Sequence, residues 1–136
     1  MIFTIGFTKK SLEQFIKLLK ENNVERIIDI RLKNNSQLAG FAKGKDLEYI
    51  LKLVGIEYVY LPSLAPTEEI FVKYKKNENW EEYEEDFKKL LKEKDAKKIL
   101  IEAVSGKKSC LLCSEDKADK CHRRLVSELI GKVKHL

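Results

Sequence analysis

The side chains best suited to chemistry gather in one stretch near the end of the chain, Ser109–Arg124. This stretch, SCLLCSEDKADKCHRR, holds all three cysteines of the chain and one of its two histidines. Thiols and imidazoles serve as nucleophiles, bases and metal ligands, and arginines bind anions. The pattern is typical of a buried strand, Ser109–Cys113, followed by a charged loop and a helix that Asp119 caps. It therefore predicts a site between the end of a strand and the start of a helix.

Strand and helix patterns alternate along the whole chain. Short apolar runs predict buried strands at residues 2–5, 26–30, 56–60 and 109–113. Apolar residues at helical spacing predict helices at residues 12–19, 47–54, 80–91, 96–103 and 125–130, with a further short helix at residues 66–74. Ser11 with Gln14, and Asp95, are expected to cap two of these helices. The alternation predicts one α/β domain over residues 1–136, with a mainly parallel four-stranded sheet and helices on both faces.

Polar residues follow the predicted strands at one edge of this sheet. In parallel sheets, ligands bind beyond the carboxyl ends of the strands. The candidate ligand contacts at that edge are Thr8, Asp29, Arg31, Cys121, His122 and Arg123, and the candidate catalytic residues are Cys113 and Glu115. The long polar loop at residues 33–45 adds the hydroxyl group of Ser36. His135, by contrast, is expected to lie exposed at a frayed chain end.

The charges of these candidates favour an anionic ligand. The guanidinium groups of Arg31 and Arg123 suit phosphate or carboxylate, and the start of the last helix adds free N–H groups. The same field lowers the pKa of a nearby thiol, and Glu115 and Asp29 can act as acid or base. Structural alternatives stay open. Cys113 can be a small buried core residue, and the two arginines and two acids can form salt bridges that only join the strand ends.

A metal site is the weaker interpretation of the cysteines and the histidine. The spacing Cys110-x2-Cys113-x7-Cys121-His122 resembles that of zinc ligands. However, Cys110 and Cys113 point to opposite faces of a strand. Adjacent residues such as Cys121 and His122 also diverge by about 100° around a helix. A set of Cys113, Cys121 and Glu115 is less strained, but the sequence predicts no metal site and identifies no cofactor.

A cysteine phosphatase or sulfurtransferase also places a cysteine between a strand and a helix. Such an enzyme needs a tight loop of backbone N–H donors around its anion, usually with glycine. The loop at residues 114–120 has no glycine and three acidic side chains, which repel an anion. The sequence therefore disfavours this class of enzyme.

Composition and charge limit the possible functions. The 136 residues are 43% hydrophobic and 36% charged, which is typical of a globular domain. The net charge of +5 allows an anionic partner such as a nucleotide or nucleic acid, although a lysine-rich solvated surface is the simpler explanation. There is no signal peptide and no long apolar run, so we expect a cytoplasmic protein without a membrane partner. An odd number of cysteines then argues for free thiols and against a disulfide framework.

Several motifs match those of one family. Thr4–Gly6 matches a T-I-G-H-S opening, and Asp29–Arg31 matches a D-V-R motif. Leu111–Glu115 and Cys121–Arg123 match an L-L-C-x-E…C-H-R signature. The chain thus resembles, over nearly its whole length, the domain-of-unknown-function family 488 (DUF488), which implies a small cytoplasmic α/β domain of prokaryotic type and the same site, without a settled reaction. Phe7–Thr8 stands where the family has His-Ser, so any proton transfer by that histidine is absent from this chain.

Three functional hypotheses follow from the sequence. The first is a pocket that binds, and can also process, a small anionic or nucleotide-like ligand at the carboxyl edge of the sheet. The second is a nucleic-acid-associated basic module, in which surface lysines bind phosphates and the Cys/Glu/Arg cluster is structural. The third is a protein-interaction domain without catalysis. The sequence leaves open which ligand is bound, whether a reaction is catalysed, and the oligomeric state.

Overall fold

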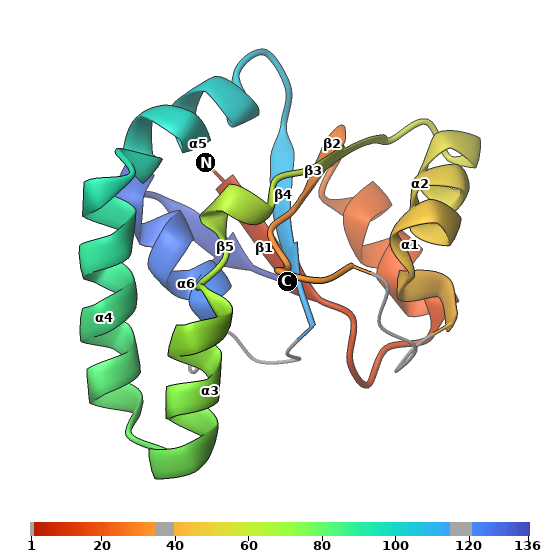
Figure 1. Cartoon of the computed structure of the whole chain (residues 1–136). Coiled ribbons are helices and arrows are strands. Elements are labelled where there is room, and N and C mark those ends of the chain that lie inside the picture. Colours follow the sequence, from red (N-terminus) through yellow and green to blue (C-terminus); the bar gives the residue numbers. More distant parts are fainter. Residues whose placement is uncertain (1, 35–39, 115–120) are drawn as a thin grey trace.

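Strands and helices alternate along the chain, as the apolar patterns predict (Figure 1). The computed structural model describes residues 2–34, 40–114 and 121–136. Its strands are β1 (Ile2–Gly6), β2 (Arg26–Asp29), β3 (Glu57–Tyr60), β4 (Ser109–Cys113) and β5 (Val133–His135). Its α-helices are α1 (Leu12–Glu21), α2 (Gly44–Leu53), α3 (Glu68–Asn77), α4 (Trp80–Glu93), α5 (Ala96–Val104) and α6 (His122–Ser127). Short 3-10 helices lie at Gly40–Ala42, Pro62–Leu64 and Glu128–Ile130.

All described strands form one parallel sheet in the order β3-β2-β4-β1-β5. The predicted α/β class and parallel sheet are confirmed, but the expected number of four strands is wrong. The fifth strand, β5, has three residues and only one apolar side chain, Val133, so it gives no strand pattern in the sequence. His135 is exposed, as expected, but its backbone is not frayed. It pairs with Thr4 of β1, and its Nδ1 lies 2.5 Å from Thr4 Oγ1.

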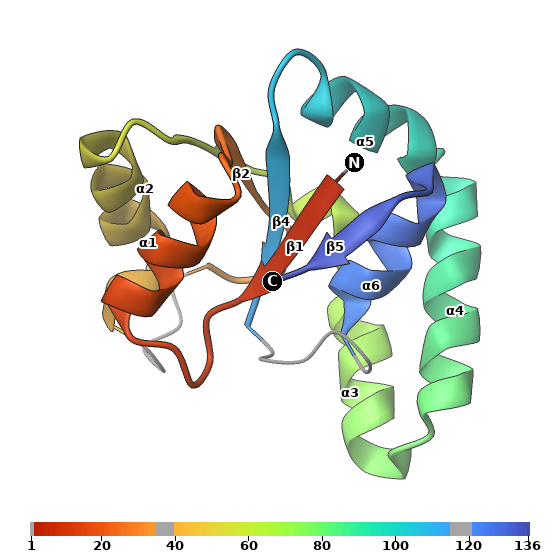
Figure 2. The ribbon, with the colours of Figure 1, turned by 180° about the vertical axis from the view of Figure 1, so that it is seen from behind.

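Two apolar cores hold helices against the two faces of the sheet, as predicted (Figure 2). On one face, α1 and α2 pack over strand residues such as Ile5 and Ile27. On the other face, α4, α5 and α6 pack over Ile28 and Leu111, and α3 adds partly buried side chains. Consecutive strand residues point to opposite faces, so each strand contributes to both cores.

Of the predicted helix caps that the structure describes, one is confirmed and one is wrong. Ser11 and Gln14 form the predicted capping box at the start of α1. Asp95 is not a side-chain cap for α5, because its backbone is left-handed with φ of 53° and its carboxylate makes no capping hydrogen bond. The predicted cap of the last helix, Asp119, lies outside the described residues. The residue before α6 is Cys121, in an extended conformation.

The topology opens the sheet at the carboxyl ends of β2 and β4. The helix that follows β2 in the chain, α2, covers one face, whereas α6, which follows β4, covers the other. Where neighbouring strands send their connections to opposite faces, a crevice remains beyond the strand ends, and this is the usual ligand position in open parallel sheets. In the described part of the chain, no helix combines the length and the apolar character needed to cross a bilayer.

Candidate functional site

A cleft of about 470 Å³ lies beyond the carboxyl ends of β1, β2 and β4. From the strand ends, its lining includes Phe7, Arg31, Lys33 and Cys113. The side formed by α3 and α4 is largely aromatic, and the start of α6 adds Cys121 and His122. The volume falls within the range of small-molecule sites, roughly 300–1,000 Å³. The edge of the sheet singled out by the sequence therefore holds a cleft of small-ligand size.

Arg31 enters the cleft region as half of a buried ion pair with Asp29. Its Nε donates to Asp29 Oδ1 at 2.8 Å, and its Nη2 donates to Oδ2 at 2.7 Å. The hydroxyl group of Tyr58 donates to the same Oδ2 at 2.5 Å. Asp29 is 0% exposed and Arg31 is 4% exposed. Nη1 of Arg31 has no hydrogen-bond acceptor among the described residues, and the guanidinium carbon lies 5.3 Å from the centre of the Phe7 ring.

Arg31 and Tyr58 both keep their protons beside Asp29. Burial alone would lower the pKa of Arg31, but the hydrogen bonds and the charge of Asp29 outweigh it and raise that pKa. Burial raises the pKa of Tyr58, and its hydrogen bond to Asp29 raises it further. Arg31 is therefore a fixed cation and Tyr58 a neutral hydrogen-bond donor under physiological conditions.

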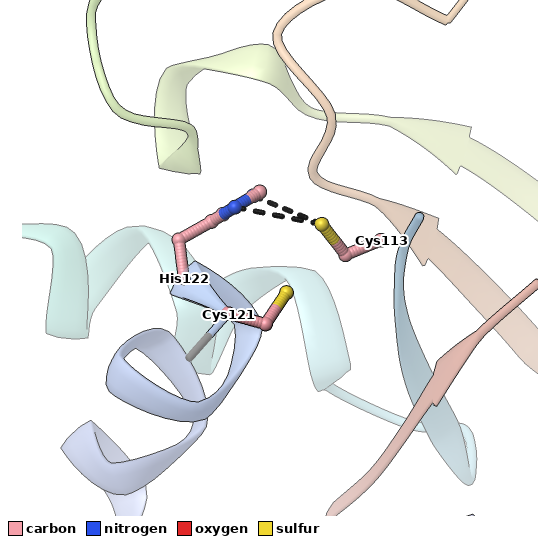
Figure 3. Close-up of side chains that lie close together, drawn as sticks. All are labelled: Cys113, Cys121 and His122. Atoms are coloured by element: carbon pink, nitrogen blue, oxygen red, sulfur yellow. Dashed lines mark hydrogen bonds between the residues drawn. The ribbon is translucent and has the colours of Figure 1, made fainter. Parts of the chain in front are cut away.

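Cys113, Cys121 and His122 meet where the end of β4 approaches α6 (Figure 3). All three are buried, and their sulfur and nitrogen atoms lie within 4.8 Å of one another. Cys113 Sγ is 3.5 Å from His122 Nδ1. His122 Nε2 lies 2.8 Å from the carbonyl oxygen of Ile30. Because a carbonyl can only accept, Nε2 carries the ring proton and Nδ1 is unprotonated. Cys113 Sγ also lies 3.8 Å from Nε2, so it sits beside the ring and not along the lone pair of Nδ1. We call these three side chains the thiol–imidazole cluster.

The predicted divergence of Cys121 from His122 is wrong. Cys121 is the residue before α6, with φ of −129° and ψ of 141°, so helical geometry does not govern its side chain. A hydrogen bond with Cys113, together with burial, raises the pKa of the Cys121 thiol. The prediction for Cys110 is confirmed, because it packs in the core on the opposite face, where burial raises its pKa. Two of the three cysteines therefore line the cleft, and both can hold a metal together with His122.

Arg123 lies away from the cleft. It is fully buried, and its Nε donates to Thr4 Oγ1 at 3.2 Å, which joins α6 to β1. It does not line the cleft in the described part of the chain, so the expected convergence of Arg31 and Arg123 on one anion is not supported. Arg123 instead holds α6 against the sheet.

The sequence predicts four further residues at the site. Two of them have structural roles, and two lie outside the described residues. The hydroxyl group of Thr8 donates to the carbonyl oxygen of Ser114 at 2.5 Å, which ties the end of β1 to the end of β4. Asp29 has both carboxylate oxygens engaged and positions Arg31. Ser36 and Glu115 lie outside the described residues. Direct ligand contact by Thr8 or Asp29 is therefore less well supported than contact by Arg31.

Sequence reasoning missed an aromatic wall along one side of the cleft. This wall consists of Phe71 and Tyr74 on α3 and Trp80 and Tyr83 on α4. Trp80 and Tyr83 stack with their ring centroids 4.8 Å apart. Their helical spacing is visible in the sequence, but this spacing predicts only a buried face and does not separate core from ligand wall.

Comparison with known proteins identifies the family of this chain but indicates no activity. The family model described as domain of unknown function DUF488 matches residues 11–130. The match includes Arg31, the three residues of the thiol–imidazole cluster and the aromatic wall. Neither the curated proteins nor the solved structures contain a match. The resemblance that the strand-end motifs indicate is confirmed, and the chain belongs to the DUF488 family.

Proposed function

We propose that the cleft binds a small molecule with an anionic group and a flat ring system, as in a nucleotide. The observation that carries this proposal is the buried guanidinium group of Arg31, whose Nη1 lacks an acceptor among the described residues. A buried donor without an acceptor costs about 1–3 kcal/mol, and a ligand oxygen beside it would recover that free energy. Membership of DUF488 implies no ligand, so the proposal rests on the cleft itself.

The anionic end of the ligand would lie against Arg31. Arg31, Lys33 and Lys75 line the cleft with positive charge, and Glu68 adds one negative charge. Asp29 offsets much of the charge of Arg31, so the attraction depends on the directed N–H groups of Nη1 more than on net charge. Phosphate and carboxylate oxygens are the acceptors that a guanidinium group binds best.

The ring end of the ligand would lie along the aromatic wall. Trp80 and Tyr74 are only partly buried, so their rings keep surface for contact with a ligand. Flat apolar rings pack well against such side chains in offset or edge-to-face arrangements. An anion-binding group at one end and aromatic rings at the other favour a nucleotide-like molecule over inorganic phosphate.

The predicted site residues take different parts in this proposal. Arg31 contacts the ligand, and Asp29 is a positioning residue that holds Arg31. Cys113, Cys121 and His122 line the cleft beside the ligand. Catalysis by Cys113 with Glu115 stays a prediction, since Glu115 lies outside the described residues.

The other two hypotheses have weaker support. Lysines at the surface often pair with acids, as in Lys73 with Glu82, Lys88 with Glu84 and Lys107 with Glu57. Such mixed charge differs from the continuous positive stripe by which proteins bind a nucleic-acid backbone. A protein-interaction domain has in its favour two exposed apolar side chains of α2 among the described residues, Tyr49 and Leu53, which are too few for a docking surface. The nucleic-acid hypothesis is also tested by the binding experiment.

Trp80 allows a direct test, because it is the only tryptophan of the chain and lines the cleft. Reduced, metal-free protein is titrated with adenosine monophosphate, adenosine and inorganic phosphate while tryptophan fluorescence is followed. We expect a saturable change, with the monophosphate binding more tightly than either of its parts. Arg31→Lys keeps the positive charge but loses the planar fork, so we expect it to weaken monophosphate binding about tenfold and leave adenosine binding unchanged.

Arg26→Lys is the matched control, since Arg26 forms an ion pair with Glu57 at the opposite end of β2. It should leave all three affinities unchanged. The proposal is wrong if none of the three compounds binds, or if both arginine variants lose the monophosphate equally. Binding of duplex DNA with a steep salt dependence would favour the nucleic-acid module instead.

A further inference from the structure

The thiol–imidazole cluster has the dimensions of a metal site. In a tetrahedral zinc site, neighbouring sulfur and nitrogen ligands lie about 3.5 Å apart and two sulfurs about 3.8 Å apart, given Zn–S of about 2.3 Å and Zn–N of about 2.0 Å. The separation between Cys113 Sγ and His122 Nδ1 is 3.5 Å. All three candidate ligand atoms already lie within 4.8 Å of one another. Figure 3 shows the side chains turned toward a common point from the end of β4 and the start of α6.

The histidine is held as a metal ligand requires. Histidines that bind metals usually donate their second ring N–H to a carbonyl or carboxylate, which fixes the ring and its tautomer. Here His122 Nε2 donates to the carbonyl oxygen of Ile30 at 2.8 Å, which leaves Nδ1 unprotonated at 3.5 Å from Cys113 Sγ. Phe71 and Phe87 pack against the ring edge-on, with centroids at 6.1 Å and 5.9 Å. The tautomer that a metal ligand needs, with Nδ1 unprotonated, is therefore set before any ion arrives.

The ligand atoms of the cluster, two sulfurs and one imidazole nitrogen, determine which metal ion it favours. Two thiolates and an imidazole are soft ligands that favour Zn²⁺ over Mg²⁺ or Ca²⁺. Two thiolate charges also balance the charge of one divalent ion, which suits a buried position. Three side chains leave one of four tetrahedral positions for another ligand, and all three line the cleft. Two cysteines, one histidine and an exchangeable ligand form a donor set of catalytic zinc centres, whereas structural centres use four side chains.

We propose that Cys113, Cys121 and His122 bind one Zn²⁺ ion whose fourth position opens to the cleft. Water or an anionic oxygen of a cleft ligand takes that position. This inference is independent of the proposed nucleotide-like ligand, because metal binding is measured on the protein alone. The competing explanation is a pair of thiols packed beside a histidine with no affinity for metal, and the two differ in a direct binding experiment.

The experiment uses the full chain, stripped of metal, fully reduced and kept under argon, with its thiols counted. Zn²⁺ is titrated in competition with a chromophoric chelator, and Co²⁺ is added in a parallel series. We expect one equivalent of Zn²⁺ per chain and a rise in melting temperature on its addition. With Co²⁺ we expect intense tetrahedral d–d bands and thiolate-to-cobalt charge-transfer absorption.

Three variants locate the site, and one controls for it. Cys113→Ser, Cys121→Ser and His122→Gln should each weaken Zn²⁺ binding by more than the ~10–100-fold that loss of an outer-sphere partner causes. His122→Gln is the mildest of these, since its amide N–H can still reach the carbonyl of Ile30. The control is Cys110→Ala, a buried cysteine on the opposite face, which should keep full stoichiometry and affinity.

The absence of stoichiometric Zn²⁺ binding by the reduced wild type would overturn the proposal. Unchanged affinity in folded Cys121→Ser and His122→Gln would do so too, because the ion would then lie elsewhere. If these variants do not fold, the Co²⁺ spectrum of the wild type decides, since a site without thiolates shows no charge-transfer absorption. Loss of binding in Cys110→Ala would also count against the site.

Discussion

Strand β2 carries an arginine–carboxylate pair at each end, and the two pairs differ in exposure and in hydrogen bonding. At the amino end, Arg26 Nε donates to Glu57 at 3.0 Å, and its Nη1 donates to two backbone carbonyls at the end of α5, at 2.6 Å and 3.0 Å. At the carboxyl end, Arg31 donates twice to Asp29, and its Nη1 has no acceptor in the described part of the chain. The Glu57 side chain is 41% exposed, whereas that of Asp29 is 0% exposed.

The Nη1 group of Arg26 donates to protein carbonyls, whereas the Nη1 group of Arg31 has no acceptor in the described part of the chain. An exposed pair stays hydrated, contributes little to stability, and can exchange partners freely. A buried pair loses hydration at both charges and is favourable only when its remaining donors and acceptors are satisfied. The pair at the carboxyl end leaves one donor unsatisfied beside a cleft. The two ends of β2 should therefore respond very differently to the same kind of substitution.

The largest expected effect is that of Asp29→Asn. The substitution leaves the buried charge of Arg31 without its counter-ion, and breaking one partner of a buried pair costs roughly 3–5 kcal/mol. Glu57→Gln at the other end of β2 should change the free energy of unfolding far less, because Glu57 is exposed and Arg26 keeps its two backbone acceptors. Urea unfolding of both variants measures the contrast.

A double variant tests whether the loss comes from the unpaired charge. Asp29→Asn combined with Arg31→Met should be more stable than Asp29→Asn alone, because no buried charge is left without a partner. If the double variant is the less stable of the two, the loss has another origin, such as broken packing around Asp29. Equal losses in Asp29→Asn and Glu57→Gln would remove the contrast between the two ends of β2.

Part of this contrast can be predicted from the sequence, because strand alternation is local. Asp29 and Arg31 lie two residues apart at the end of an apolar run, so they share a face. The order of the strands is not local, and only the pairing of β2 with β3 brings Tyr58 to Asp29. The short strand β5 escapes prediction for a similar reason, since its three residues acquire a strand conformation only by pairing with β1.

The candidate site, too, can be predicted only in part from the sequence. The positions of Cys113 and His122 follow from a strand end and a helix start, but no sequence pattern predicts the extended backbone of Cys121. The sequence predicts an anion contact at Arg123, because its guanidinium group lies at a helix start that also offers free backbone N–H groups. Its burial depends on Thr4, a residue more than a hundred positions away that accepts its hydrogen bond.

Tyr58→Phe should have a smaller effect than Asp29→Asn. The variant loses the hydrogen bond from the hydroxyl group to Asp29, and bonds to charged groups contribute roughly 1.5–3 kcal/mol. Arg31 still neutralises Asp29, so no unpaired charge results. Tyr60→Phe is the matched control, because that hydroxyl donates to the neutral carbonyl of Leu32 at 2.7 Å, a bond of roughly 0.5–1.5 kcal/mol. Equal losses in urea unfolding would show that Asp29 does not strengthen the Tyr58 bond.

The smallest effect concerns alkaline pH. Burial and the hydrogen bond to Asp29 raise the pKa of Tyr58 in the folded protein. Below the ordinary tyrosine pKa of about 10, the hydroxyl is neutral in both states and its contribution is fully present. Above it, the unfolded chain releases the proton while the folded protein retains it, so stability falls as the pH rises. The added slope is at most about 1.4 kcal/mol per pH unit, reached where the unfolded chain has lost the proton and the folded protein has kept it.

Urea midpoints of the wild type and Tyr58→Phe, measured from about pH 9 to about pH 11, isolate this contribution, since lysine titration is common to both proteins. The stability of the wild type should fall more steeply over this window than that of the variant. Burial also raises the pKa of Tyr60. Tyr58→Phe should therefore keep the part of the alkaline loss of stability that Tyr60 causes, and Tyr60→Phe should keep the part that Tyr58 causes. Parallel curves of stability against pH for the wild type and Tyr58→Phe would mean that Tyr58 ionises at its ordinary pKa. The hydroxyl group of Tyr58 would then not be hydrogen-bonded to Asp29 as the structure has it.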